Sequence, residues 1–232
     1  DVKGDGIVLN NGHLNLKNSV INSAEGSGIA TRSDNNLIDG MMNNQLTLDA
    51  VTINAQNGIY IDKTTMIDID NSVITSALRA ISIGGQSSGI IKNSVLTTQG
   101  ENDAVTIFDD GTDILFQNTQ IISKSVGLHA DDGAKITFED GSIQSGQVNR
   151  PGGYGVRSTG NGSVINVSGT QFFLAPGSSG SANSTSIARA GRNGQINLDH
   201  IQLQYQEHTV DVTKAGALLY ADLGGQILLK NS

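Results

Sequence analysis

Two pairs of adjacent aspartates are the residues of this sequence whose type and spacing could most readily do chemistry. Asp109-Asp110 and Asp131-Asp132 are each followed by a glycine, and His129 lies just before the second pair. Four carboxylates close together could hold a calcium ion or supply the acid and the base of glycoside cleavage. One hypothesis is therefore a polysaccharide lyase or hydrolase that uses these four aspartates.

The same aspartates also fit a structural role. Each Asp-Asp-Gly run occupies the place where other parts of the chain read Asn-Asn-Gly, as at 10–12, or Asn-Gly, as at 161–162. Asn, Asp and Gly are the residues that tight turns favour. No Gly-x-Ser-x-Gly elbow and no phosphate-binding loop accompanies them. We therefore expect turn residues, no catalytic residues and no cofactor, with calcium at the four aspartates as a weaker alternative.

The histidines do not indicate a metal site either. The four are His13, His129, His200 and His208, and none stands at metal-ligand spacing from another. His129 falls on an outward position of a predicted strand, so we expect it to be a solvated surface side chain.

A degenerate repeat organises the chain that must position these residues. The pattern apolar-x-apolar-x-Asn-Ser-x-apolar occurs at 14–21 and again at 67–74, and looser copies occur between and after them. The shortest unit is about 21 residues, a length typical of solenoid repeats. The copies start at 14, 46, 67, 89, 114, 136, 165, 196 and 227.

Each repeat contains three short segments with period-2 alternation, which indicates strands. A unit this short cannot bury its own inner face, but stacked units bury one continuous column. Only 37% of the residues are hydrophobic and 4% aromatic, which suits a narrow column and not a wide core. The sequence therefore predicts an all-β fold, a single-stranded parallel β-helix of about nine coils with three short strands per coil, formed by residues 1–232 as one domain.

Asparagine recurs at the corner after the first strand of the repeat. Asn tolerates the left-handed conformation of a sharp corner, and stacked amides can hydrogen-bond to one another. We expect an asparagine ladder there, although turn preference alone would also place these residues. They are Asn18, Asn71, Asn93, Asn118 and Asn231.

Four insertions interrupt the repeat, and they are candidates for function because solenoids tolerate loops and place binding sites on them. They cover about 30–45, 146–154, 175–185 and 206–216. The last three fall between the second and third strands of adjacent coils, so we predict that they stack into a loop ridge. Its binding candidates are Arg150, Tyr154, Glu207, His208 and Lys214.

Two outward rows of side chains are the other candidates. On the third strand, Tyr60, His129 and Arg157 could contact a sugar or a peptide by stacking and hydrogen bonding, although scattered surface residues would look the same. The predicted third-strand row is Val8, Ala30, Tyr60, Ser82, Thr106, His129, Arg157, Ala188 and Leu219. The predicted second-strand row, which would suit a polar surface or lateral contact with another copy, is Asn22, Asn54, Thr75, Thr97, Ile122, Gln144, Phe173 and Gln204.

Composition narrows the possible partners. The net charge of −8 disfavours a protein that binds the phosphate backbone of nucleic acid. No apolar run approaches the length of a membrane span, so we expect no membrane insertion by this segment. The absence of cysteine excludes a disulfide scaffold and thiolate zinc sites.

The degenerate coils, the abundance of glycine, asparagine, serine and threonine, the lack of cysteine and the acidic charge resemble the passenger domains of classical autotransporters, the pertactin and AIDA-type adhesins. The resemblance covers the whole chain and implies a right-handed β-helix. It also implies a fragment of a longer passenger, displayed at the bacterial cell surface by a C-terminal outer-membrane barrel that this chain does not contain.

The function that the resemblance implies is adhesion and not catalysis. Expected partners are a host surface glycan, an extracellular-matrix protein or another copy of the chain, with self-association and biofilm formation in the last case. Two alternatives stay open: the hydrolase built on the four aspartates, and a structural spacer for a domain further towards the N-terminus.

Overall fold

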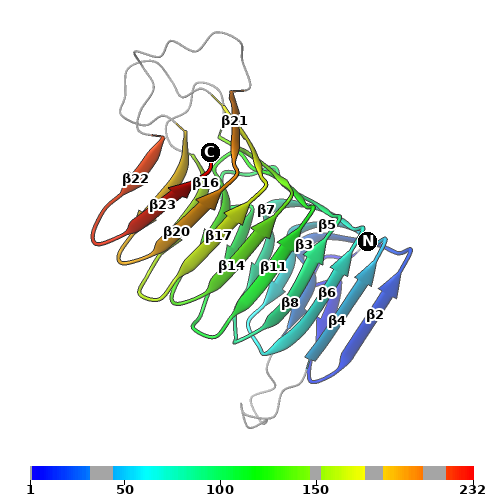
Figure 1. Ribbon diagram of the computed structural model, residues 1–232. Helices are drawn as coiled ribbons and strands as arrows, with labels where there is room; N and C mark the ends of the chain where they lie inside the picture. The colour runs from blue at the N-terminus through cyan, green and yellow to red at the C-terminus, as the bar shows by residue number, and fades with distance from the viewer. Residues whose placement is uncertain (1, 32–43, 147–152, 176–184, 206–217) are drawn as a thin grey trace.

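The computed structural model describes residues 2–31, 44–146, 153–175, 185–205 and 218–232. These residues form a stack of β-coils in which the paired strands are parallel (Figure 1). The described part contains no helix, and therefore no helix long and apolar enough to cross a membrane. The predicted all-β parallel β-helix is confirmed.

One face of the solenoid, called the first face here, is a nine-stranded sheet of one strand per coil. The nine predicted repeat starts, from Leu14 to Ile227, lie side by side in its register. The repeat period therefore set the coil boundaries correctly. The strands are β2 (His13–Lys17), β4 (Asn44–Asp49), β6 (Thr65–Asp70), β8 (Ser88–Lys92), β11 (Asp113–Gln117), β14 (Lys135–Glu139), β17 (Val164–Ser168), β20 (Gln195–Asp199) and β23 (Gln226–Lys230).

The other two faces belong to one branched sheet. The second face consists of the first halves of β3 (Val20–Thr31), β5 (Thr52–Ile61) and β7 (Val73–Ile83), followed by β9 (Val95–Thr98), β12 (Gln120–Ile122), β15 (Ser142–Ser145), β18 (Gln171–Leu174) and β21 (Gln202–Tyr205). The third face consists of β1 (Ile7–Leu9), the second halves of β3, β5 and β7, and then β10 (Val105–Ile107), β13 (Val126–Ala130), β16 (Tyr154–Thr159), β19 (Ser186–Gly191) and β22 (Leu219–Ala221).

The expectation of three short strands per coil is wrong for the first three coils. There β3, β5 and β7 run through the corner between the second and third faces as single long strands. A register shift, between Ser23 and Ser27 in β3, absorbs the bend. The chain turns there by a bulge, which bends a strand without ending it. From β9 and β10 onward the second-face and third-face strands are separate, as predicted.

The interior is a slender column of aliphatic side chains. Ile59, Ile81, Val105 and Leu128, which the alternation predicts to face inward, are stacked in register and have no exposed surface. On the inner side of the first face, Phe116 in β11 and Phe138 in β14 stack with their ring centroids 6.1 Å apart. Parallel stacking thus buries a core that no single coil could form.

The corner after the first face has the left-handed backbone that the asparagines predict. Asn118 has φ 47° and its side-chain amide donates to Asn93 Oδ1 at 2.8 Å, while the Asn93 amide donates to Asp70 Oδ1 at 2.8 Å. The ladder is therefore only partly made of asparagine pairs. Ala50 and His200 adopt the same conformation at equivalent corners, so the corner, and not the amide, is the invariant feature.

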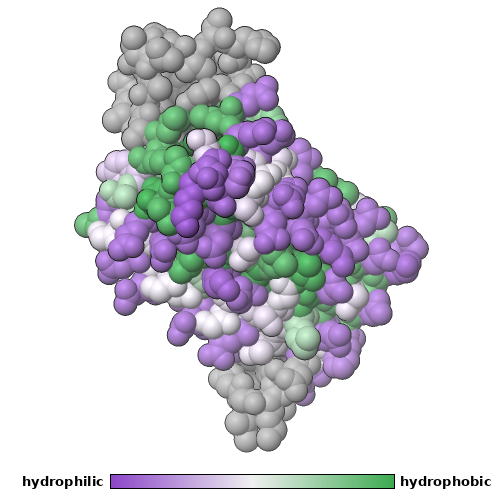
Figure 2. Space-filling view, viewed as in Figure 1, coloured by the Kyte–Doolittle hydropathy of each residue, from purple (hydrophilic) through white to green (hydrophobic). Residues whose placement is uncertain are grey.

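The predicted second-face row is confirmed throughout its length, from Asn22 to Gln204. On the first face the outward side chains are mostly polar, and Figure 2, which views this side, shows a largely hydrophilic surface with a continuous apolar area over the C-terminal coils.

The insertions fall mainly outside the described residues, which lack 32–43, 147–152, 176–184 and 206–217. The first starts later than predicted, because Ala30 and Thr31 still pair with Val8 and Leu9 in the third face. At its other end, Asn44 is already in β4. The last three connect β15 to β16, β18 to β19 and β21 to β22, which is the corner that the sequence indicates.

Removing one ring of the Phe116–Phe138 pair tests the column. The Phe138→Ala variant removes a side chain with no exposed surface, and we expect it to lower the free energy of unfolding by about 3–5 kcal/mol in urea titrations. Met66→Ala, at a side chain that is 66% exposed on the first face, should change it by less than about 0.5 kcal/mol. Equal effects would contradict the column.

Two substitutions at Asn118 separate the backbone contribution from the amide contribution. Asn118→Ala keeps the left-handed strain and loses the hydrogen bond to Asn93, so it should cost about 1–2 kcal/mol of unfolding free energy. Asn118→Gly loses the same bond without strain and should cost less. If the glycine variant were no more stable than the alanine variant, backbone strain at the corner would not be the source of the difference.

Candidate functional site

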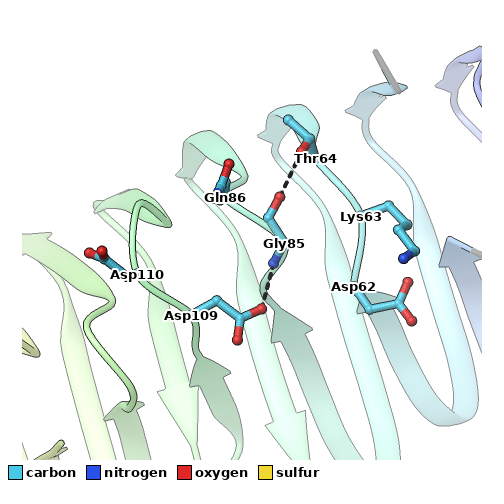
Figure 3. Close-up of a pocket in the computed structure, with 7 residues that line it drawn as sticks. All are labelled: Asp62, Lys63, Thr64, Gly85, Gln86, Asp109 and Asp110. Carbon is cyan, nitrogen blue, oxygen red and sulfur yellow. Dashed lines mark hydrogen bonds between the residues drawn. The ribbon is translucent and has the colours of Figure 1, made fainter. Parts of the chain in front are cut away.

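The predicted acid patch lies at the turns that join the third face to the first. Asp109 and Asp110 line a shallow groove with Asp62 and Gly85, together with neighbouring turn residues (Figure 3). Asp109 has φ 71°, and its carboxylate accepts the Gly85 amide hydrogen at 2.8 Å. The Thr112 amide donates to the Asp109 carbonyl at 3.2 Å, which closes the turn. Asp109 is thus a turn residue that also ties its coil to the previous one.

The four aspartates do not converge on one site. In Figure 3 the Asp109 carboxylate points towards Gly85, whereas Asp110 points away from it. Asp131 Oδ1 instead accepts the hydroxyl of Thr159 at 2.7 Å on the third face. The described residues contain no group of three or more metal-type side chains. These positions support the turn interpretation over the calcium or acid–base alternatives.

The third face brings together two of the predicted binding residues and shows one of them in an unexpected state. Tyr60 is 39% exposed, as a surface candidate should be. His129 is only 6% exposed, so its prediction as a solvated side chain is wrong. Arg157 lies beside it in register on the next strand.

The predicted outward row is also wrong at its end. Ala188 and Leu219 occupy the inward register, because they pair with Val156 and with each other. The outward positions belong to Arg189 and Tyr220. A charged guanidinium cannot occupy the apolar column, so the small residue faces inward and Arg189 faces out.

His129 is buried because side chains from three other segments surround it. Asp103, in the connection between β9 and β10, places Oδ2 2.9 Å from His129 Nδ1 and accepts from Arg157 Nη2 at 2.9 Å. On the other side of the ring, His129 Nε2 lies 2.9 Å from Thr159 Oγ1, whose hydroxyl donates to Asp131. Five side chains from four segments of chain thus form one network across the face.

Hydrogen-bond geometry fixes part of the proton distribution in this network. Because Thr159 gives its single hydrogen to the Asp131 carboxylate, its oxygen can only accept from His129 Nε2, which must therefore carry a hydrogen. At the other nitrogen two arrangements fit: Nδ1 donates to Asp103 when the ring is charged, or accepts from Arg157 Nη2, 3.0 Å away, when it is neutral.

Asp103, His129 and Thr159 make the contacts of a triad of acid, base and nucleophile, but their hydrogens are not placed for proton transfer from Thr159 to His129. Because Nε2 already holds a hydrogen, the ring cannot accept the one on Thr159. The network therefore does not activate a hydroxyl group, and its evident role is to hold Arg157 in place.

The surroundings of the Asp103 carboxyl favour its ionised form. Burial works against its charged form, since the side chain is only 13% exposed. The hydrogen bond from His129 and the charges of Arg157, His129 and Arg79 outweigh burial, and together they lower the pKa of Asp103.

A second cluster follows on the next coils. Arg189 donates to the Asp222 carboxylate at 3.1 Å and to the Tyr154 hydroxyl at 3.2 Å. Its guanidinium carbon lies 5.5 Å from the ring centroids of both Tyr154 and Tyr220. Burial disfavours the charged form, but the hydrogen bond to Asp222 and the interaction with Tyr154 raise the pKa of Arg189 overall.

Of the predicted loop-ridge candidates, only Tyr154 lies among the described residues. Tyr154 is described and belongs to β16, at its first residue, not to a loop. The other ridge candidates, Arg150, Glu207, His208 and Lys214, lie outside the described residues.

Comparison with known proteins agrees with this geometry. The profile of the right-handed β-helix region matches residues 38–192, which is more than half of the chain. The chain belongs to the right-handed β-helix family. No curated protein and no solved structure gives a significant match. The family match confirms the handedness that the resemblance implies, and it names no ligand and no reaction.

Replacing Asp103 with Asn tests the network of this β-helix. Asn keeps the shape of the side chain but removes the charge that His129 and Arg157 face. We expect a loss of roughly 3 kcal/mol in unfolding free energy at neutral pH, as for one partner of a buried ion pair. Asp113→Asn, whose carboxylate is half-exposed beside Lys135, should cost less than about 1 kcal/mol. Similar losses for both would remove the distinction between them.

The pH dependence of this stabilisation follows from the lowered pKa of Asp103. The folded chain binds this proton less tightly than the unfolded chain, in which the pKa of the carboxyl is near 3.8. The stabilisation is therefore fully present above about pH 4 and is lost as the pH falls through the lower folded-state pKa. Urea unfolding at a series of pH values should show the difference between wild type and Asp103→Asn shrinking in acid. If the difference in unfolding free energy between wild type and Asp103→Asn did not change with pH, the substitution would act through packing and not through charge.

Proposed function

We propose that this β-helix is part of the exported passenger of a bacterial autotransporter and acts as a cell-surface adhesin, with its third face as the binding surface. One observation carries the proposal. The tyrosines whose side chains are described, Tyr60, Tyr154 and Tyr220, all lie in third-face strands. The described arginines lie on the same face or in the turn that ends it, at Arg79, Arg157, Arg189 and Arg192.

Arginine and tyrosine are the residues that protein interfaces use most as energetic anchors. Both carry a large contact area with fixed geometry and directed hydrogen bonds. Their segregation to one of three faces supports that face as the one that meets a partner. The repeated stack supports adhesion as well, because a solenoid offers long continuous surfaces.

The other two faces are less suited to recognition. On the first face, lysines stand next to aspartates of adjacent coils: Lys17 lies 2.7 Å from Asp49, and Lys135 lies 2.8 Å from Asp113. These pairs neutralise each other at the surface. On the second face, the confirmed outward row from Asn22 to Gln204 carries no charge. It suits lateral contact with another copy, which stays a second possible partner.

The proposed partners are a host surface glycan or an extracellular-matrix protein, with self-association and biofilm formation if the partner is another copy. The proposed location is the cell surface, with anchoring by a C-terminal barrel outside this chain. We propose a binding function and not an enzymatic one. Asp109 and Asp110 point apart, Asp131 accepts from Thr159, and His129 Nε2 has no capacity to accept a proton.

Two exposed tyrosines provide the test. Tyr60 is 39% exposed and Tyr220 is 47% exposed, so replacing both with Ala should leave the fold intact. We expect the double variant to lose most binding to the partners that the wild-type chain selects from an array of glycans and matrix proteins. Bacteria that display it should adhere less to host cells.

Met66→Ala is the matched control, because it removes an exposed side chain from the first face. It should bind like the wild type. Absence of any partner on the array, together with unchanged adhesion and no concentration-dependent self-association, would reject the adhesin proposal. Unchanged binding by the tyrosine variant alone would reject the third face.

A further inference from the structure

We propose that His129 is a proton-dependent switch of the third face: its neutral ring holds Arg157 in place, and its charged ring releases Arg157 in acid. The switch itself needs no partner. Its consequence for binding rests on the proposed adhesive function and adds a regulation to it.

The neutral ring gives Arg157 two acceptors. Arg157 Nη2 lies 2.9 Å from Asp103 Oδ2 and 3.0 Å from His129 Nδ1. Because the Nη2 group carries two hydrogens, it donates one to the carboxylate and the other to the ring. The guanidinium is then fixed by two segments of chain that are far apart in the sequence.

The proton that the ring gains in acid goes to Nδ1. Nε2 carries a hydrogen in both charge states, because it donates to Thr159 Oγ1 at 2.9 Å while Thr159 donates to Asp131 at 2.7 Å. Nδ1 is therefore the ring nitrogen that changes from acceptor to donor. Histidine is the residue type that commonly changes charge between about pH 5 and 8.

A charged ring removes one of the two acceptors of Arg157. Nδ1 then donates to Asp103 Oδ2, 2.9 Å away, and no longer accepts from Nη2. Two cationic groups whose nitrogen atoms are 3.0 Å apart now share one carboxylate oxygen. Like charges at this distance repel each other, so one of the two side chains has to move.

Arg157 is the side chain that is placed to move. The His129 ring is buried and has hydrogen-bond partners at both nitrogens. The Arg157 side chain is 28% exposed, so its guanidinium can turn towards water, where its charge is solvated. Asp103 then pairs with the charged ring alone.

The next coil adds to the repulsion. His129, Arg157 and Arg189 are successive register partners on β13, β16 and β19, and such positions lie about 4.8 Å apart. A charged His129 therefore makes three consecutive cations along the solenoid. Arg157 is the middle one and is repelled from both sides.

Charged groups face the ring from the segments packed around it, whereas its register partner on β10, Thr106, is uncharged. The hydrogen bond from His129 and the nearby positive charges lower the pKa of Asp103. This carboxyl therefore stays ionised while the ring titrates, and the ring is the group that changes. The charged groups are Asp103 in the connection before β10, Arg157 on β16, Asp131 beyond Thr159, and Arg79 on β7, which acts on Asp103.

The switch changes what the third face offers to a partner. A guanidinium that is fixed before binding loses little conformational entropy when it makes a contact, whereas a mobile one has to be ordered first. A partner that contacts Arg157 should therefore bind more weakly in acid than at neutral pH.

The test follows both side chains by NMR in the isotope-labelled 232-residue chain, between about pH 8 and 5 and without a partner. At the upper end the ring should be neutral with its hydrogen on Nε2. As the ring gains its proton, the Arg157 Nε–H signal should change with the same midpoint. Its heteronuclear NOE should fall, because the released guanidinium is more mobile. Arg189 Nε–H, whose side chain is held by Asp222 and Tyr154, is the internal control and should keep its NOE.

A coupling between two sites is reciprocal, so Arg157 has to influence the ring in return. Arg157→Gln removes the cation that opposes the charged ring. We expect His129 in this variant to bind its proton at least about fivefold more tightly, which moves the midpoint to higher pH. Lys135→Gln makes the same change of charge on the first face and should change the proton affinity by less than about twofold.

His129→Gln removes the titrating group and should make the NOE of Arg157 independent of pH. If this variant did not fold, the wild-type titration and Arg157→Gln would still decide the question. An Arg157 signal that does not follow the ring, a ring that keeps one charge state over the whole range, or an unchanged midpoint in Arg157→Gln would each overturn the switch.

These results are independent of the adhesin proposal, which is tested by binding at one pH. Loss of the switch would leave adhesion standing. Loss of adhesion would leave the coupled titration of His129 and Arg157 standing and would remove only the expected weakening of binding in acid.

Discussion

Everything in this molecule depends on parallel hydrogen bonding between successive coils in an unbroken register. The column of Ile59, Ile81, Val105 and Leu128 exists only because each coil lies directly on the previous one. A coil cannot bury its inner face alone, so stability is shared between neighbours. The same register fixes the outside, because side chains at equivalent positions must lie about 4.8 Å apart along the axis.

That spacing decides which surface residues are tolerated next to each other. Like charges at successive coils would repel, and unlike charges or amides can pair. The first face follows this rule with lysine–aspartate pairs, and the corner follows it with amides that donate to the coil before. The third face places Arg157 and Arg189 in adjacent positions, and Asp103 and Asp222 hold them there. On the first face Asp49 and Asp70 are also like-charged register partners, and Lys17 and Lys92 contact them from the coils on either side.

The sequence predicts the features that repeat, and it misses the ones that do not. Period and alternation give the coil boundaries, the inward column and the second-face row, because each follows from a pattern within one repeat. The burial of His129 could not be predicted in this way, since Asp103 comes from a connection outside the repeat and Thr159 from the next coil. The predicted outward row is wrong at Ala188, because the register of β19 cannot be counted across the insertion that precedes it. Only the fact that Arg189 cannot lie in the apolar core could have given the correct register.

The same distinction bears on what the faces can do. A reaction needs groups that converge on one point and exchange protons, whereas stacked coils spread equivalent groups along a line. In the cluster around His129 the ring already carries a hydrogen on Nε2, and Thr159 donates its hydroxyl hydrogen to Asp131, so the cluster holds Arg157 in place. Arg157, which this cluster holds, is the register partner of Arg189, whose guanidinium contacts the rings of Tyr154 and Tyr220. The two held arginines are therefore the feature of the third face on which the proposed binding function depends.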